Sequence, residues 1–140
     1  MAKITMICAL LFLVPQVVFS ETQFSKDWIW DISGDEILYA ATVNKEDRVL
    51  GQYCYLSEGM CYYLVNLGIS CKEGDEYPSI LNSDAGVVEV RLVCGENFKN
   101  NNIFFIKPFE DVDDLIKKAD NVGFAVAMRE GKFKVVRFSL

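Results

Sequence analysis

The chain reads YCYLSEGMCYY from Tyr53 to Tyr63, with two cysteines placed symmetrically about the segment Leu56-Ser57-Glu58-Gly59. Two aromatic-rich runs flank this segment, a pattern that predicts a β-hairpin with a turn at its centre. In such a hairpin Cys54 faces Cys61 across antiparallel strands, at a Cα separation within the range that a disulfide requires. The stretch therefore predicts a disulfide-linked antiparallel β structure.

Two further cysteines, Cys71 and Cys94, follow the hairpin. The fifth cysteine, Cys8, lies in the N-terminal segment that is expected to be cleaved, so four cysteines remain. An even number in an exported chain indicates disulfides, and the hairpin pairing of Cys54 with Cys61 leaves Cys71 for Cys94. The alternatives are a four-thiolate zinc site and a redox-active dithiol. Both normally have CxxC spacing, which is absent here. We therefore expect two structural disulfides, no metal site and no cofactor.

The N-terminal 20 residues have the features of a cleavable signal peptide. Lys3 provides a short positive segment, and Ile4–Val14 is an apolar run interrupted by one threonine. Val18 and Ser20 are acceptable at the −3 and −1 positions of a cut before Glu21. A transmembrane anchor, the alternative, needs about 20 apolar residues. No later stretch approaches that length, so we expect no transmembrane segment after cleavage.

Residues 21–140 are expected to form a single disulfide-bearing domain, because they have the length of one domain and contain no Pro/Gly/Ser linker. The predicted strands are residues 28–32, 37–43, 48–55, 60–65, 87–94, 103–106, 122–128 and 132–140. The segments Gly74–Gly86 and Asn97–Asn102 are rich in turn-forming residues and are predicted to be loops. The prediction is an α+β fold, mostly antiparallel β (a sandwich or small barrel), with one helix near the C-terminus and a closing C-terminal hairpin.

The predicted helix spans Phe109–Ala119. Its apolar residues recur at helical spacing, and its charges follow the helix dipole, with acids in the first turn and lysines in the last. The acidic residues also offer oxygen ligands for Ca²⁺, but their spacing is not that of an EF-hand loop. We interpret the acidic cluster as helix-stabilising charge; it comprises Glu110, Asp111, Asp113 and Asp114.

Charge and composition exclude several classes of function. The chain carries 14 Lys and Arg against 20 Asp and Glu, a net charge of −6. An acidic chain without a basic run is unsuited to nucleic acids and to anionic membrane surfaces. The sequence contains no histidine, which excludes Ser-His-Asp and Cys-His catalysis and the commonest zinc sites. An enzyme built on this chain would depend on carboxylates, Tyr, Lys or thiols.

The aromatic residues are the candidate binding residues. Trp28 and Trp30 alternate along one predicted strand, and Tyr53 and Tyr55 alternate along another, so each pair lies on one face of its strand. Two such strands in one sheet would form a continuous aromatic patch, suited to sugar rings or to a partner protein. The alternative is that these side chains fill the core of a small domain.

The C-terminal third, together with Asp27-Trp28, resembles a known family. It contains a strand ending at Cys94, a helix carrying Asp114-Leu115-Ile116-Lys117-Lys118-Ala119, and a closing hairpin ending in Val136-Arg137-Phe138-Ser139-Leu140. This order is similar to that of the invasion-associated locus B type of exported proteobacterial protein. The resemblance implies a small, β-rich, periplasmic protein. It assigns no site residues.

Together these observations predict a small exported protein that is not an enzyme and that binds a partner or associates with the cell envelope. Within this class the options run from a protein inhibitor to a host-directed virulence accessory. We expect a periplasmic or secreted location and a protein or glycan partner. The alternative is a secreted carboxylate-based hydrolase, which needs two acidic groups facing each other across a cleft.

Overall fold

The computed structural model describes residues 23–25, 27–34 and 36–140. The predicted signal peptide and the cleavage site before Glu21 lie outside the described residues. The elements in chain order are β1 (Gln23–Ser25), β2 (Trp28–Ser33), β3 (Ile37–Val43), β4 (Val49–Tyr55), β5 (Met60–Asn66), β6 (Glu76–Ser83), β7 (Gly86–Phe98), β8 (Asn101–Lys107), α1 (Phe109–Ile116), β9 (Asn121–Ala127), a 3₁₀ turn (Arg129–Gly131) and β10 (Phe133–Ser139).

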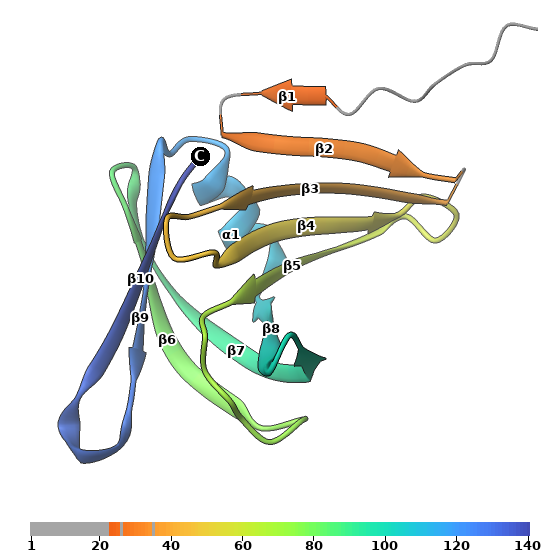
Figure 1. Ribbon diagram of the computed structural model, residues 1–140. Helices are drawn as coiled ribbons and strands as arrows, with labels where there is room; N and C mark the ends of the chain where they lie inside the picture. The colour runs from red at the N-terminus through yellow and green to blue at the C-terminus, as the bar shows by residue number, and fades with distance from the viewer. Residues whose placement is uncertain (1–22, 26, 35) are drawn as a thin grey trace, which may run out of the picture.

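The described strands form one antiparallel sheet in the order β1-β2-β3-β4-β5-β8-β7-β6-β9-β10. Consecutive hairpins build β1 to β5, and β5 joins β8 through the pairs Tyr63–Ile106 to Asn66–Ile103. The sheet curls so that its two halves face each other (Figure 1). This arrangement confirms the predicted mostly antiparallel class with one helix and a C-terminal hairpin.

Side-chain contacts, and not a strand ladder, bring the two halves together at one end. The Thr42 hydroxyl donates a hydrogen bond to the Ser139 carbonyl (3.0 Å), and the Asn44 amide donates one to the Arg137 carbonyl (3.0 Å). In the described part of the chain β10 contacts β3 without pairing with it. The sheet is therefore an incompletely closed barrel.

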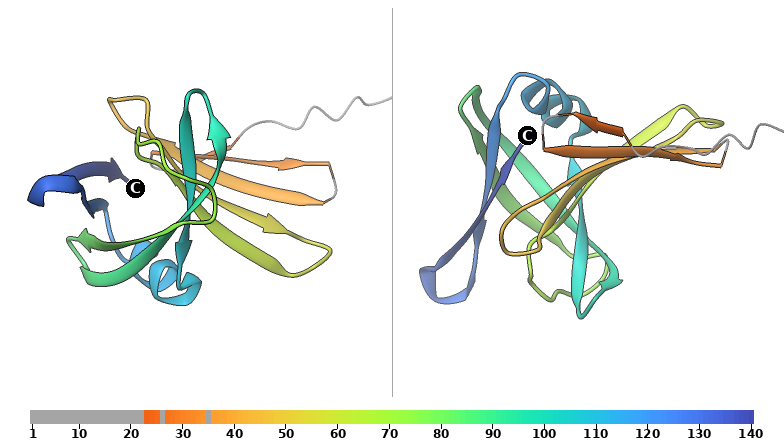
Figure 2. Two further views of the ribbon diagram at one scale, coloured as in Figure 1. Left: turned by 90° about the horizontal axis from the view of Figure 1, so that it is seen from below. Right: turned by 45° about the horizontal axis from the view of Figure 1, so that its top comes forward.

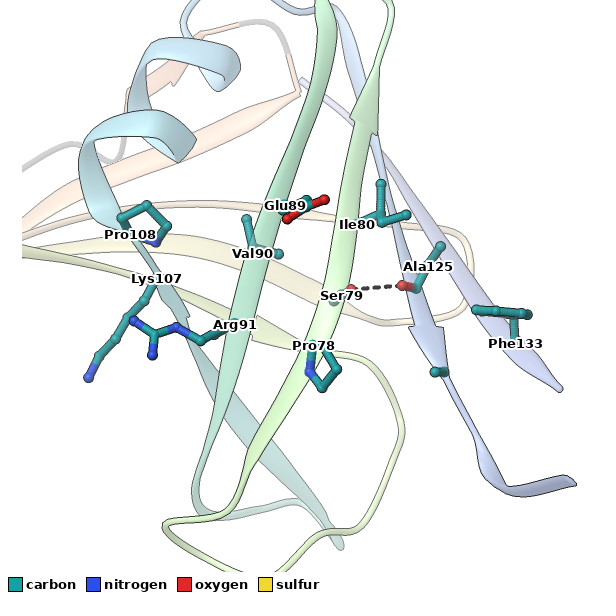
Figure 3. A pocket seen from close by; sticks show the side chains of 11 residues that line it. Pro78, Ser79, Ile80, Glu89, Val90, Arg91, Lys107, Pro108, Ala125 and Phe133 are labelled. Atoms are coloured by element: carbon teal, nitrogen blue, oxygen red, sulfur yellow. Dashed lines mark hydrogen bonds between the residues drawn. The ribbon is translucent and has the colours of Figure 1, made fainter. Parts of the chain in front are cut away.

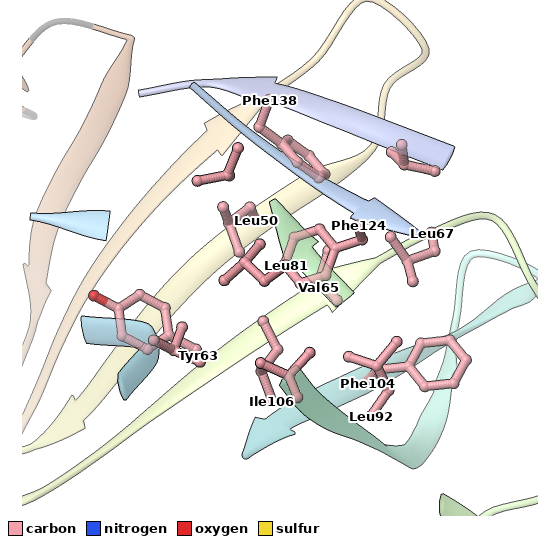
Figure 4. Close-up of a cluster of buried hydrophobic side chains, with 14 of the residues drawn as sticks. Leu50, Tyr63, Val65, Leu67, Leu81, Leu92, Phe104, Ile106, Phe124 and Phe138 are labelled. Carbon is pink, nitrogen blue, oxygen red and sulfur yellow. The ribbon is translucent and has the colours of Figure 1, made fainter. Parts of the chain in front are cut away.

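The core lies between the two halves of the sheet (Figure 4). Every second residue of β8 and β9 is buried, as are Val136 and Phe138 of β10, the period that places alternate side chains on one face of a strand. The largest fully buried side chains come from both halves of the sheet and from the segments beside them: Phe104, Phe124, Phe138, Leu50, Leu67, Leu81 and Leu92.

Helix α1 packs against β5, β7 and β8. Its residues Val112, Leu115 and Ile116 are buried, as the helical spacing of apolar residues predicted. The helix ends three residues before the predicted Ala119, because the Lys118 N–H bonds to the Leu115 carbonyl and tightens the last turn before β9.

The prediction of a loop over Gly74–Gly86 was wrong, because β6 occupies most of this segment and pairs with both β7 and β9. Turn-forming residues at both ends of the strand hid its alternation, in which Ser79 and Leu81 are buried. Pro78 is tolerated because the pairing with β9 begins one residue later, at Ser79.

Both predicted disulfides are present. Cys54 and Cys61 are directly paired residues of β4 and β5, with their Cα atoms 4.0 Å apart. Cys71 is bonded to Cys94 at a Cα distance of 6.1 Å, and this bridge ties the segment after β5 to β7 in the core.

Candidate functional site

The four predicted binding residues lie on opposite faces of the sheet. One cross-strand row runs Trp30–Ala40–Gln52–Tyr63, and Tyr63 is 3 % exposed in the core. The neighbouring row runs Asp31–Tyr39–Tyr53–Tyr62. Because successive residues of a strand point to opposite faces, the Trp30 row faces the interior and the Tyr53 row faces outward.

The tryptophans belong to the interior face. Trp28 packs against the core cluster, and Trp30 is half-buried. Tyr53 and Tyr55 are 37 % and 39 % exposed on the outer face. The structure thus does not join the Trp pair to the Tyr pair in one continuous patch, because Trp30 and Tyr53 occupy adjacent rows.

A groove of about 380 Å³ contains the tyrosine pair on the outer face of β3, β4, β5 and β8. We call it the tyrosine groove. The residues that line it are Ala41, Val49, Gly51, Tyr53, Tyr55, Tyr62, Leu64, Val65, Asn66, Glu96, Phe98, Ile103 and Phe105.

Ring contacts hold the aromatic side chains of this face in place. Tyr53 stacks on Tyr39 with ring centroids 5.8 Å apart. Tyr62 meets Phe105 edge-on at 6.2 Å and Tyr55 edge-on at 6.3 Å. Such pairs restrict side-chain rotation, so the exposed rings form a pre-arranged surface.

The groove has little charge. Among its described lining residues only Glu96 carries a charged side chain. The Asn66 side-chain oxygen already accepts a hydrogen bond from the Gly68 N–H (3.0 Å). At one end of the groove the Lys99 ammonium lies 5.4 Å from the centroid of the Phe98 ring. The groove therefore offers apolar and aromatic area with one carboxylate.

Sequence reasoning missed part of this site. Tyr62 could have been found, because pairing Cys54 with Cys61 also places Tyr53 opposite Tyr62. Phe98 was expected in a polar loop over Asn97–Asn102, but the connection takes only two residues outside the strands, Lys99 and Asn100, both with positive φ. Phe105 reaches the groove through the pairing of β5 with β8, for which no local sequence signal exists.

A second hollow, of about 560 Å³, lies on the other half of the outer sheet surface (Figure 3). Its side chains come mainly from β6, β7 and β9, and Ser79 Oγ donates a hydrogen bond to the Ala125 carbonyl beneath it (2.9 Å). This hollow is more polar in character, because Glu89, Arg91 and Lys107 all line it. Arg91 is also directly opposite Lys107 in the sheet and 3.4 Å from Glu76.

The chain also contains one buried ionisable group with a clear structural role. The Tyr63 hydroxyl donates a 2.9 Å hydrogen bond to Asp113 of α1, and Lys117 forms an ion pair with the same carboxylate. Burial and, after it, the bond to Asp113 raise the pKa of Tyr63 far above its usual value. The Tyr63 ring stacks on Phe109 at 5.3 Å. These contacts attach the helix to the sheet.

The hydrolase alternative gains no support from the hollows of the described chain. The tyrosine groove has one carboxylate, Glu96, and the second hollow has one, Glu89. A third, shallow hollow beside α1 contains Asp111 and Asp114, both from the same helix. Within the described residues no cluster of His, Cys, Asp or Glu is arranged to hold a metal ion, and no helix is long and apolar enough to cross a membrane.

Comparison with known proteins gives a similarity of fold. No family model and no curated protein matches the sequence. Among solved structures, the chain is similar to invasion-associated protein B from Bartonella henselae, with a TM-score of 0.59 and 11 % sequence identity. The match covers 86 % of this chain and 88 % of that chain. The resemblance inferred from the C-terminal third is thus confirmed at the level of the fold.

Proposed function

We propose that this protein is an exported, non-enzymatic binding protein that recognises a partner molecule through the tyrosine groove. The observation that carries the proposal is the exposed aromatic face itself. Tyr53, Tyr55 and Tyr62 are each more than a third exposed, although they lie on the side of the sheet opposite the buried Leu50 and Tyr63. Exposed apolar patches on small proteins usually mark interaction sites, and Tyr is among the residues most often found at their centres.

The position of the groove supports this role. The far ends of β2 to β5 extend beyond the other strands (Figures 1 and 2). Leu56 at the turn is 50 % exposed, and Met60 beside it is 44 % exposed. A partner could therefore reach the groove and the hairpin tip together without meeting the rest of the domain.

Export is supported by the two disulfides and by the N-terminal sequence. Disulfides persist in the periplasm and outside the cell and are rare in the cytosol. N-terminal sequencing of protein recovered from the periplasm or the medium tests this part of the proposal. A chain beginning at Glu21 supports export by a cleaved signal peptide; a chain still beginning at Met1 contradicts it.

Affinity capture with matched variants tests the binding role. The double variant Tyr53→Ala/Tyr62→Ala removes the centre of the groove. The control, Phe133→Ala/Val135→Ala, removes two exposed apolar side chains of β10, which are 69 % and 50 % exposed. Both variants are first checked for an unchanged thermal transition.

The proposal predicts a partner, from envelope or host-surface fractions, that the wild-type and β10 variants capture and the groove variant does not. Capture that survives in the groove variant, or that both variants lose equally, contradicts the proposal.

A further inference from the structure

We infer that the tyrosine groove takes a basic segment of a partner protein, in which Arg or Lys residues are interspersed with apolar ones. This inference rests on the proposed binding function and adds the chemistry of the ligand. Three observations carry it: the charge of the groove, the electrostatics of its rings, and its small number of polar groups.

The charge of the groove and its surroundings is acidic. Glu96 is exposed and is the one charged residue among the described lining residues. Glu36 and Glu58 are exposed at the hairpin tips where β3 begins and β4 ends. The described strand ends, residues 31–34, 36–39 and 53–62, contain three acidic and no basic residues. A basic segment lying along the groove therefore meets Glu36 and Glu58 at the hairpin tips and Glu96 within the groove, where the Lys99 ammonium lies over the Phe98 ring.

The aromatic rings add attraction for a cation. The face of a Tyr or Phe ring is electrostatically negative and attracts a guanidinium or ammonium group that lies above it. One ring of the groove already has such a contact, because the Lys99 ammonium lies 5.4 Å from the centroid of Phe98. Tyr53, Tyr55 and Tyr62 offer the same chemistry to a cation supplied by a partner.

The polar groups of the groove are too few to suit a neutral sugar. A saccharide needs several donors and acceptors beside the aromatic platform to fix its hydroxyl groups. Asn66 is 7 % exposed with its oxygen bonded to Gly68, and the Tyr62 hydroxyl donates to Met60 Sδ (3.7 Å), so that Glu96 and the hydroxyls of Tyr53 and Tyr55 are the main polar groups offered to a ligand. The apolar floor, which includes Gly51 and Leu64, is suited to aliphatic side chains and to the methylene stems of Arg and Lys.

Fluorescence anisotropy with labelled synthetic peptides tests the inference. Three peptides of equal length share their Leu and Tyr positions and carry Arg, Gln or Glu at the alternate positions. We expect the Arg peptide to bind the purified wild-type protein about tenfold more tightly than the Gln peptide, or about 1.4 kcal/mol. The Glu peptide should not bind, and added salt should weaken the Arg complex.

Two single variants locate the effect. Glu96→Gln should weaken binding of the Arg peptide about threefold, since it removes the charge within the groove. Glu89→Gln, an exposed carboxylate of the second hollow, is the matched control and should leave the affinity unchanged. Tyr53→Ala should weaken both peptides and the Arg peptide more, because it removes apolar area and also a ring face that attracts the cation.

The inference is overturned if the Gln peptide binds as tightly as the Arg peptide, or if Glu96→Gln and Glu89→Gln have the same affinity for the Arg peptide. It is also overturned if a neutral oligosaccharide binds in a Tyr53-dependent manner and the Arg peptide does not. In those cases a partner that is captured by the wild type and lost in Tyr53→Ala/Tyr62→Ala still supports the proposed function. If that double variant keeps its captured partner, the proposed function itself fails.

Discussion

The tyrosine groove and the interior face of the same strands are formed by adjacent residues, whose side chains point to opposite sides of the sheet. Tyr62 is 38 % exposed and meets other rings of the outer surface, whereas Tyr63 is 3 % exposed and reaches Asp113 of the helix. The same chemical group is thus exposed on one face and attaches the helix to the sheet on the other. Because the strand period is two residues, we expect the effects of substitutions in β2 to β5 to divide by the face of the sheet on which a residue lies.

The largest effect is expected where the interior face depends on the C-terminal hairpin. Val136, Phe138 and Leu140 are at most 5 % exposed, and β10 is paired along its whole length with β9. Deleting residues 132–140 should therefore abolish the cooperative thermal transition. The control is Phe133→Ala/Val135→Ala, on the outer face of the same strand, which should melt like the wild type. A truncated protein that still unfolds cooperatively as a monomer would show that the interior face does not need β10.

The two disulfides provide the next comparison. On the chain-entropy model, the Cys71–Cys94 bridge contributes about 3.4 kcal/mol and the Cys54–Cys61 bridge about 2.5 kcal/mol. The first also lies in the core, where Cys94 is 2 % exposed, and the second lies near the hairpin tip. Replacing both cysteines of each bridge by Ala should thus destabilise more for Cys71–Cys94, as measured by denaturant unfolding. A larger loss for the hairpin bridge would indicate that the projecting strand ends are structurally more important than their exposure implies.

Trp28 and Tyr53 test the division between faces directly. Trp28→Ala should lower the free energy of unfolding by about 2 kcal/mol, somewhat below the ~3–5 kcal/mol of a fully buried aromatic residue, because Trp28 is only half-buried. Tyr53→Ala should lower it by less than about 1 kcal/mol and act on binding instead. Thermal unfolding of both variants is the measurement. A strongly reduced melting temperature for both would remove the argument for a binding surface on the outer face.

The smallest effect concerns the two neighbouring tyrosines and depends on pH. Tyr63→Phe removes the hydrogen bond to Asp113 and should cost about 1 kcal/mol at pH 7. Because the pKa of Tyr63 is raised in the folded state, the unfolded chain loses this proton first as the pH rises past about 10. The wild type should therefore lose about 1.4 kcal/mol more than Tyr63→Phe by pH 11.

Urea unfolding of the wild type and of Tyr63→Phe at several pH values measures this difference. A gap between wild type and Tyr63→Phe that stays constant from pH 7 to about pH 11 would contradict the assigned role of Tyr63.

Much of the fold followed from local sequence patterns. The symmetric cysteines placed the β4–β5 hairpin and its disulfide, and the helical spacing of Val112, Leu115 and Ile116 placed the buried face of α1. The alternation in residues 122–140 predicted the closing hairpin. These patterns involve residues that are near one another in the chain, where the spacing of side chains alone fixes their relative positions.

The candidate site followed only in part. The prediction that Trp28 and Trp30 share one face of their strand was correct, and so was the same prediction for Tyr53 and Tyr55. Whether a face points inward or outward depends on which strands cover it. The exposed face was decided by the pairing of β5 with β8, by the curl of the sheet and by the position of β6 in it. Strand β6 was not predicted, because its segment is rich in turn-forming residues.

The sequence by itself therefore determined the antiparallel class, the disulfide partners, the helix and the spacing of the aromatic side chains. All of these depend on local periodicity and on the number and spacing of the cysteines. The tertiary structure alone decided that the Trp pair faces the core and that Tyr53, Tyr55 and Tyr62 line a groove with Phe98 and Phe105. The physical reason is that a strand has two chemically similar faces. Only contacts between residues distant in the chain, here from α1 against β5 and from β10 against β3, determine which face is removed from water.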